Sequence, residues 1–235
     1  MDLSTARALV TGGGTGIGLA TARLLVERGA KVAIGGRRPD VLAEAARAVG
    51  AHPVAGDVSR PGDAERMVAE AEQALGGYDT LVNNAGLGRF GALVDLTADD
   101  MRAVWETNVL GATLAAQASA RRFVAQRRGN IVNVASTAGS RGYAGGSAYA
   151  STKFALTGLT ECWRAELRPH NVRVMQVNPS EVLTPFFEAA GMGPRPDNPT
   201  KLRPEDIAHV IVSMLALDDR GFVTEATVFA TNPQG

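Results

Sequence analysis

The stretch TGGGTGIG, residues 11–18, places a run of glycines between an apolar segment, RALV at 7–10, and an amphipathic segment, LATARLLVERG. A glycine turn between a strand and a helix lets backbone N–H groups approach a pyrophosphate and directs the helix N-terminus at it. Glycines also form ordinary tight turns, but this position in the first strand–helix unit of the chain favours a dinucleotide site. We assign to this site Gly12, Gly14, Thr15, Gly16, Ile17 and Gly18.

Short apolar runs alternate with longer amphipathic segments along the rest of the chain. Strands are expected at 7–12, 31–36, 52–57, 79–84, 130–136, 172–179 and 226–231, and helices at 16–29, 38–49, 61–76, 98–127, 147–168 and 204–217. Regular alternation of strands and helices predicts a parallel sheet with helices on both faces. The predicted class is therefore α/β, a Rossmann-type doubly wound sheet of about seven strands, in one domain spanning the whole chain.

The second predicted strand ends in Gly36, and Arg37 and Arg38 follow it. At this place in a dinucleotide fold an acidic residue binds the adenosine ribose, whereas arginine accommodates a 2′-phosphate. The glycine leaves room and the arginines supply positive charge, so the sequence favours NADP over NAD; an exposed arginine pair at a helix start is the alternative. Asp57 is either a helix cap or an adenine contact. The neighbouring Val58 is also assigned to the cofactor site.

Tyr149 and Lys153 stand four residues apart in YASTK, residues 149–153. Side chains at this spacing are neighbours on a helix, so a packed tyrosine beside a solvated lysine would be ordinary. The other interpretation is a catalytic acid and its tuning charge, because a nearby cation favours the phenolate and lowers the phenol pKa from about 10. The spacing alone does not separate these interpretations.

Three further motifs accompany the glycine turn and YASTK: NNAG at 83–86, Asn108 within WETNVLG, and Ser136 within IVNVASTAG, thirteen residues before Tyr149. Any one of them could arise by chance. In this order and at this spacing, they make the chain resemble the short-chain dehydrogenase/reductase family over nearly its whole length. The resemblance extends to members of the 3-oxoacyl-[acyl-carrier-protein] reductase type.

The resemblance implies a catalytic set of Asn108, Ser136, Tyr149 and Lys153. In the family the lysine also binds the nicotinamide ribose, and the asparagine holds a water that links the lysine to solvent. Further cofactor contacts are implied for Asn84, Ala85, Gly86, Pro179, Val182 and Thr184. Two features depart from the family pattern: Ser180 stands where a glycine is usual, and the chain ends in ATVFATNPQG.

Reduction of a carbonyl by hydride leaves an alkoxide, so the site must supply a proton and hold negative charge. Tyr149 is the candidate general acid, with Lys153 as the cation that lowers its pKa. Ser136 ends a predicted strand and is either a donor to the substrate oxygen or a turn cap. Asn108 lies inside a predicted helix, where without the resemblance it would be a satisfied core amide.

Composition excludes several other classes of protein. Lys+Arg and Asp+Glu are both 24, so the positive field typical of nucleic-acid binders is missing. The chain has one cysteine, Cys162, expected to be a small apolar filler, and no apolar run long enough to span a bilayer, which favours a cytoplasmic protein without membrane contact. The three histidines have no ligand-spaced partners, so no metal is expected, and no G-x-S-x-G motif suggests a hydrolase.

The leading hypothesis is an NADP(H)-dependent oxidoreductase acting on a ketone or secondary alcohol, with a 3-oxoacyl thioester as one candidate. The alternatives are an NAD(H)-dependent alcohol dehydrogenase of the same family and a non-catalytic nucleotide-sensing protein. The Gly- and Pro-rich segment around 185–203 is expected to form a short substrate lid, and Phe90, Tyr143, Phe186 and Phe187 an apolar pocket. Helices 98–127 and 147–168 are apolar on more than one face, which suggests a homodimer or homotetramer.

Overall fold

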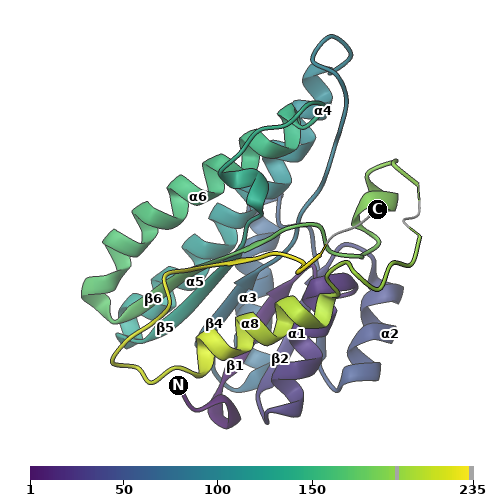
Figure 1. Cartoon of the computed structure of the whole chain (residues 1–235). Coiled ribbons are helices and arrows are strands. Elements are labelled where there is room, and N and C mark those ends of the chain that lie inside the picture. Colours follow the sequence, from purple (N-terminus) through teal and green to yellow (C-terminus); the bar gives the residue numbers. More distant parts are fainter. Residues whose placement is uncertain (194–195, 233–235) are drawn as a thin grey trace.

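The computed structural model describes residues 1–193 and 196–232, which form a seven-stranded sheet with all neighbouring strands parallel (Figure 1). The strand order is β3-β2-β1-β4-β5-β6-β7, which confirms the predicted Rossmann-type class. The strands are β1 (Arg7–Thr11), β2 (Lys31–Gly36), β3 (His52–Ala55), β4 (Thr80–Asn83), β5 (Gly129–Val134), β6 (Val172–Pro179) and β7 (Glu225–Val228). Because β1 lies between β2 and β4, the chain reverses direction across the sheet there, and this reversal opens a crevice at the carboxyl ends of the strands.

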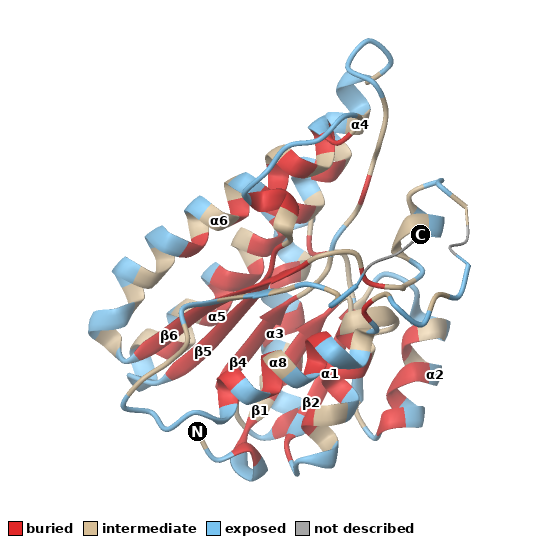
Figure 2. Cartoon of the chain, in the orientation of Figure 1, coloured by how far each residue is buried: buried red, intermediate tan, exposed pale blue. Residues whose placement is uncertain are grey.

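Helices cover both faces of the sheet because successive strand side chains point to opposite sides. Val10 of β1 belongs to the core under α1, α2 and α8, whereas its neighbour Leu9 belongs to the core under α3 and α5. Figure 2 shows buried residues concentrated on the central strands and on the inward helix faces. The helices are α1 (Gly16–Glu27), α2 (Pro39–Val49), α3 (Pro61–Leu75), α4 (Ala98–Trp105), α5 (Ala112–Gln126), α6 (Ser147–Leu167), α7 (Phe186–Ala189) and α8 (Pro204–Ala216).

The single helix predicted over 98–127 is wrong in one respect, because a π-helical turn at Glu106–Gly111 divides it into α4 and α5. Asn108 lies in this turn and is 1% exposed. Its side chain bonds the backbone of Leu87, a residue far away in the sequence. A π-helical turn breaks the regular register of a helix, and the long-range bonds of Asn108 account for its position here.

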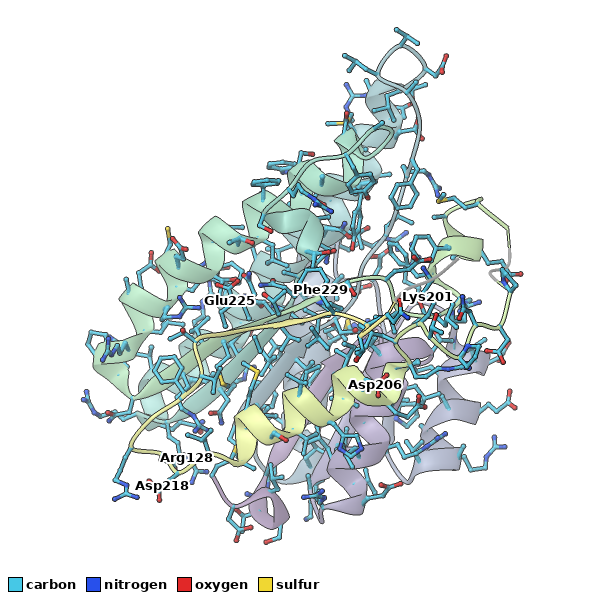
Figure 3. The ribbon with its side chains drawn as sticks, in the orientation of Figure 1. Arg128, Lys201, Asp206, Asp218, Glu225 and Phe229 are labelled. Atoms are coloured by element: carbon cyan, nitrogen blue, oxygen red, sulfur yellow. The ribbon has the colours of Figure 1, made fainter. Side chains whose placement is uncertain are left out.

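The segment expected to form the lid is short, and backbone contacts join its two ends. Val182 and Leu202 form a parallel bridge, and the N–H of Leu183 donates to the carbonyl of Leu202 at 2.9 Å. Lys201, labelled in Figure 3 near the start of α8, pairs with Glu181 at 2.9 Å. Within this segment α7 is the only helix in the described part, and residues 194–195 lie outside it.

Two smaller expectations are corrected. The last strand, predicted at 226–231, ends at Val228, and the following Phe229 is 65% exposed. Residues 233–235 of the unusual C-terminus lie outside the described residues. Cys162 is exposed on α6 and fills no core space. In the ranges 1–193 and 196–232, no helix is long and apolar enough to cross a membrane.

Candidate active site

The glycine turn connects β1 to α1 and has little space for side chains. Gly12 has a φ of +63°, and a Cβ there would lie 2.9 Å from the Cα of Ala85. A Cβ on Gly18 would overlap the carbonyl oxygen of Gly12 and lie 2.5 Å from the amide nitrogen of Asn84. Left-handed φ and such close approaches both require glycine. The turn is therefore packed against the end of β4.

Gly13 and Gly14 differ in why they lack a side chain. A Cβ on Gly13 would lie 2.6 Å from the Cβ of Ile34, so Gly13 is required by packing, which the sequence analysis did not recognise. A Cβ on Gly14 would meet only Leu42 and Val41, each at 3.7 Å, an ordinary contact. Packing within the protein therefore does not require glycine at position 14, which lines the central cavity.

Thr11 and Asn84 join the glycine turn to the end of β4. The Thr11 hydroxyl accepts hydrogen bonds from the backbone N–H groups of Asn84 and Ala85 at 3.0 and 3.1 Å. The Asn84 side-chain amide donates back to the carbonyls of Thr11 and Gly12 at 3.0 and 3.1 Å. Thr11 was missed as a functional residue, although it begins the quoted glycine stretch and is 1% exposed.

These elements border a cavity of about 690 Å³ at the carboxyl edge of the sheet. Its volume is within the range of small-molecule and cofactor sites. Every predicted cofactor residue except Gly18 lines it, and so do Ser136, Tyr149 and Lys153. Of the predicted catalytic residues, only Asn108 does not line the cavity. The four predicted pocket aromatics line it too: Phe90, Tyr143, Phe186 and Phe187.

Gly36, Arg37 and Arg38 line the cavity at the end of β2. Both arginines are exposed, and neither makes an ion pair with any residue of the described part. Asp57 also lines the cavity, but its carboxylate accepts from the N–H and hydroxyl of Ser59 at 3.1 and 2.7 Å. It therefore stabilises the turn before α3, while Arg60 occupies the N-cap position itself.

Lys153 lies on α6 and is 5% exposed. Its ammonium donates a hydrogen bond to the carbonyl of Val134 at 2.9 Å and lies 5.6 Å from the centre of the Tyr149 ring. Burial disfavours the charged form and lowers the pKa of Lys153 to about 8. The end of β5 thus fixes the lysine beside the tyrosine.

The Tyr149 ring packs against Phe90 and Phe186, with ring centres 5.6 and 5.5 Å away. Burial raises the pKa of Tyr149 above its ordinary value, and a hydrogen bond with Ser136 opposes this more weakly. Lys153 does not contribute to this shift, so the lowering expected from it is absent in this structure. The phenol is held in its neutral form.

Ser136 combines both functions considered for it. Its hydroxyl accepts from the N–H of Ala138 at 3.1 Å, as a cap of the short helical turn Thr137–Gly139. It also donates to the carbonyl of Pro179 at 3.5 Å and hydrogen-bonds Tyr149. The bonds to Ala138 and Pro179 fix the hydroxyl at the end of β5, in the cavity that Tyr149 also lines.

Asn108 uses both of its amide donors. One donates to the carbonyl of Leu87 at 2.9 Å and the other to the hydroxyl of Thr152 at 3.0 Å. Its oxygen accepts from the N–H of Leu87 at 2.7 Å. Asn108 thereby connects the loop after β4 to the turn of α6 that carries Lys153.

The cavity is completed by Pro179 at the end of β6 and by Ser180, Val182 and Thr184 after it. The Thr184 methyl group would lie 3.2 Å from a Cβ on Gly16, so this threonine packs on the glycine turn. Among non-glycine residues in the described ranges, only Arg127 and Asn171 have a left-handed φ. Ser180 therefore replaces the usual glycine without backbone strain. Across the same ranges, no group of three or more metal-ligating side chains is placed to hold a metal.

Comparison with known proteins identifies the family of the chain. The family model of short chain dehydrogenases matches residues 6–193. An uncharacterized oxidoreductase of Staphylococcus aureus strain N315, SA2266, is 32% identical over 224 residues, which cover 94% of this chain and 95% of that protein. YxnA, an uncharacterized oxidoreductase of Bacillus subtilis strain 168, is 36% identical over 190 residues, 77% of this chain but only 53% of YxnA.

A solved structure is also similar over almost the whole chain. The alcohol dehydrogenase of the archaeon Thermococcus sibiricus, complexed with 5-hydroxy-NADP, superimposes with a TM-score of 0.85 at 28% identity. The superposition covers 97% of this chain and 98% of that chain.

Proposed function

The chain belongs to the short chain dehydrogenase family, and from this premise we propose that it is an NADP(H)-dependent oxidoreductase that interconverts a ketone and a secondary alcohol. The observation that carries the proposal is the meeting of Ser136, Tyr149 and Lys153 in the same cavity as the glycine turn. A neutral phenol and a dinucleotide cradle in one cavity are what carbonyl reduction requires.

The glycine turn fits a dinucleotide. No side chain caps the N-terminus of α1, because Thr15 at the N-cap makes no capping hydrogen bond. The first N–H groups of a helix are then available to an anion, and the helix dipole favours negative charge there. The bare surface of Gly14, which packing does not explain, leaves room for close approach of a ligand. These features support a pyrophosphate at this turn.

The choice of NADP over NAD rests on the end of β2. Arg37 and Arg38 line the cavity with no acidic partner in the described residues, and Gly36 offers no carboxylate to repel a phosphate. Two unpaired guanidinium groups suit a 2′-phosphate. The bound 5-hydroxy-NADP of the Thermococcus sibiricus relative also supports this preference.

A bound nicotinamide cofactor supplies or accepts the hydride. Tyr149 then donates its proton to the developing alkoxide, and its raised pKa keeps that proton available at neutral pH. Ser136 holds the carbonyl oxygen beside the phenol. Lys153 supplies positive charge next to the ring and binds the nicotinamide ribose, as the family resemblance implies.

Asn108 acts by positioning in this proposal. Its two donors are used by Leu87 and Thr152, so only its oxygen has spare capacity to hold a relay water. Fixing the turn that carries Lys153 is its larger contribution. A non-catalytic sensor would not need this arrangement, since it requires no tuned phenol.

The assembly and the lid are further parts of the proposal. Exposed apolar side chains on α4, the π-helical turn and α6 support a homodimer or homotetramer: Met101, Trp105, Leu110 and Phe154. Residues 185–203 are proposed to form the substrate lid, because α7 places Phe186 on Tyr149. Light scattering of the purified protein would give the subunit number.

The function is tested by screening ketones and secondary alcohols with NADPH and NADH while following nicotinamide absorbance. We expect turnover of at least one carbonyl class, with kcat/KM higher for NADPH. Arg37→Ala should weaken NADPH binding by roughly 10-fold and leave NADH binding nearly unchanged. Equal affinity of wild type and Arg37→Ala for NADPH would contradict the cofactor preference, and tight cofactor binding without any turnover would favour a sensor.

A further inference from the structure

Arg141 is a cavity-lining arginine to which no function has yet been assigned. It lies in the loop between the helical turn after β5 and the start of α6, and it is exposed. Like the arginines at β2, it makes no ion pair with any residue in the ranges 1–193 and 196–232. An unpaired guanidinium at the border of a binding cavity is a candidate for recognising an anion.

The position of Arg141 assigns it to the end of the cavity near Tyr149. In the sheet, β2 and β5 are separated by β1 and β4, so the loops that follow them lie three strand spacings apart, about 14 Å. Arg141 follows Ser136 by five residues and precedes Tyr149 by eight, and all three residues line the cavity. The loop that carries Arg141 therefore lies away from Arg37 and Arg38, on the side of the cavity where Ser136 ends β5 and α6 begins.

The loop that carries Arg141 is held in a defined shape. The N–H of Gly146 donates to the carbonyl of Tyr143 at 3.1 Å, and the N–H of Gly91 donates to the carbonyl of Gly145 at 3.0 Å. A Cβ on Gly146 would lie 2.6 Å from the Tyr143 ring, so the ring lies directly on this glycine. A fixed loop lowers the entropy cost of binding. The Tyr143 hydroxyl has no hydrogen-bond partner among the described residues.

The other side of this end of the cavity is apolar. The Phe90 ring lies 6.2 Å from Phe187 and 6.4 Å from Phe186, and Met192 also lines the cavity. Two acidic residues line the cavity, and both are already engaged: Asp57 with Ser59 and Glu181 with Lys201. The lining therefore includes aromatic surface from Phe90, Phe186 and Phe187, and the loop between β5 and α6 presents the positive charge of Arg141 without an acidic partner in the described residues.

We propose that Arg141, assisted by the Tyr143 hydroxyl, binds an anionic group of the substrate. The substrate class is an amphipathic oxo compound: its carbonyl lies at Tyr149, its apolar part packs on the Phe90, Phe186 and Phe187 rings, and its carboxylate or phosphate pairs with Arg141. This inference rests on the proposed oxidoreductase function and specifies its substrate.

The test uses two pairs of probes that differ in charge. One pair is 3-benzoylpropionate and its methyl ester, and the other is acetoacetyl-CoA and the neutral N-acetylcysteamine thioester of acetoacetate. Dissociation constants and, where turnover occurs, kcat/KM are measured with NADPH for wild type, Arg141→Met and Arg141→Lys. Arg220→Met is the matched control. Arg220 is exposed, pairs with Asp218 in the turn after α8, and is not among the residues that line the cavity.

Wild type should prefer the charged member of at least one pair, and Arg141→Met should reduce that preference roughly 10- to 100-fold. Arg141→Lys should restore part of it, and Arg220→Met should leave it unchanged. A preference confined to the first pair identifies a carboxylate, and one confined to the second identifies the phosphates of a carrier. No preference in wild type, or an equal preference in Arg141→Met, overturns the anion site. Absence of turnover with persistent charge preference in binding contradicts the proposed reaction and leaves the site supported.

Discussion

The ammonium nitrogen of Lys153 lies 5.6 Å from the centre of the Tyr149 ring and donates a hydrogen bond to the carbonyl of Val134. Lys153 is buried and Tyr149 is half-buried, and desolvation disfavours the charged form of each: the pKa of Lys153 falls to about 8, and that of Tyr149 rises. At neutral pH the pair is a neutral phenol beside a cation. This state suits proton donation to an alkoxide.

Tyr149→Phe removes the proposed proton donor and keeps the ring. We expect kcat to fall by about 10²–10⁴-fold, the usual contribution of a general acid. NADPH affinity and the melting temperature should stay close to wild type, because the contacts with Phe90 and Phe186 involve the ring. Steady-state kinetics and fluorescence titration measure the two effects. A variant with substantial residual turnover would exclude Tyr149 as the acid.

Lys153→Met should abolish activity and yet stabilise the cofactor-free protein. Below pH 8 the folded wild type carries a buried ammonium that costs free energy, so the variant should be more stable by about 1–2 kcal/mol at pH 7. Between pH 8 and the ordinary lysine pKa of 10.5, the folded protein loses this proton before the unfolded chain does. Wild-type stability therefore rises with pH in this window, and the advantage of the variant disappears.

Urea unfolding at pH 7, 8, 9 and 10 measures the difference in stability between Lys153→Met and wild type. Lys31→Met is the control, because Lys31 is exposed at the start of β2 and its removal should give a pH-independent change. A stability gap for Lys153→Met that stays constant from pH 7 to 10 would show that the buried charge is not its cause.

Gly18→Ala should lower the stability of the fold, whereas Gly14→Ala should weaken only cofactor binding. An added methyl at Gly18 overlaps the Gly12 carbonyl and the Asn84 amide, so the melting temperature should fall, with a loss of about 1–3 kcal/mol. The methyl at Gly14 makes only ordinary contacts, so that variant should melt like wild type. It should nevertheless bind NADPH more weakly, because the methyl occupies the cavity surface. Wild-type affinity in Gly14→Ala would argue against a ligand at this turn.

Gly36→Asp should shift the cofactor preference toward NADH. A Cβ at this position would meet only the flexible end of Leu42, at 3.3 Å, so we expect the fold to tolerate the substitution. A carboxylate here repels a 2′-phosphate and can bind ribose hydroxyls, so KM for NADPH should rise by roughly 10-fold or more. Gly62→Asp adds the same charge in open space outside the cavity and should leave both KM values unchanged.

The sequence by itself determined the α/β class, the glycine turn and the order of the site motifs. These features are local: strand and helix periodicity, and glycines that a turn between them requires, can be recognised from neighbouring residues. The same local signals failed at Asn108, where bonds to Leu87 and Thr152 maintain a π-helical turn inside a predicted helix.

Only the tertiary structure decided what depends on residues far apart in the chain. Ile34 explains Gly13, and Thr11 reaches Asn84 across 73 positions. The pKa of Tyr149 is raised because its phenol is desolvated, and Phe90 from the loop after β4 and Phe186 from α7 pack against its ring. The spacing of YASTK does not contain this environment. Burial and charge pairing arise from the whole fold, and for this reason the free charge of Arg141 beside the cavity could be seen only there.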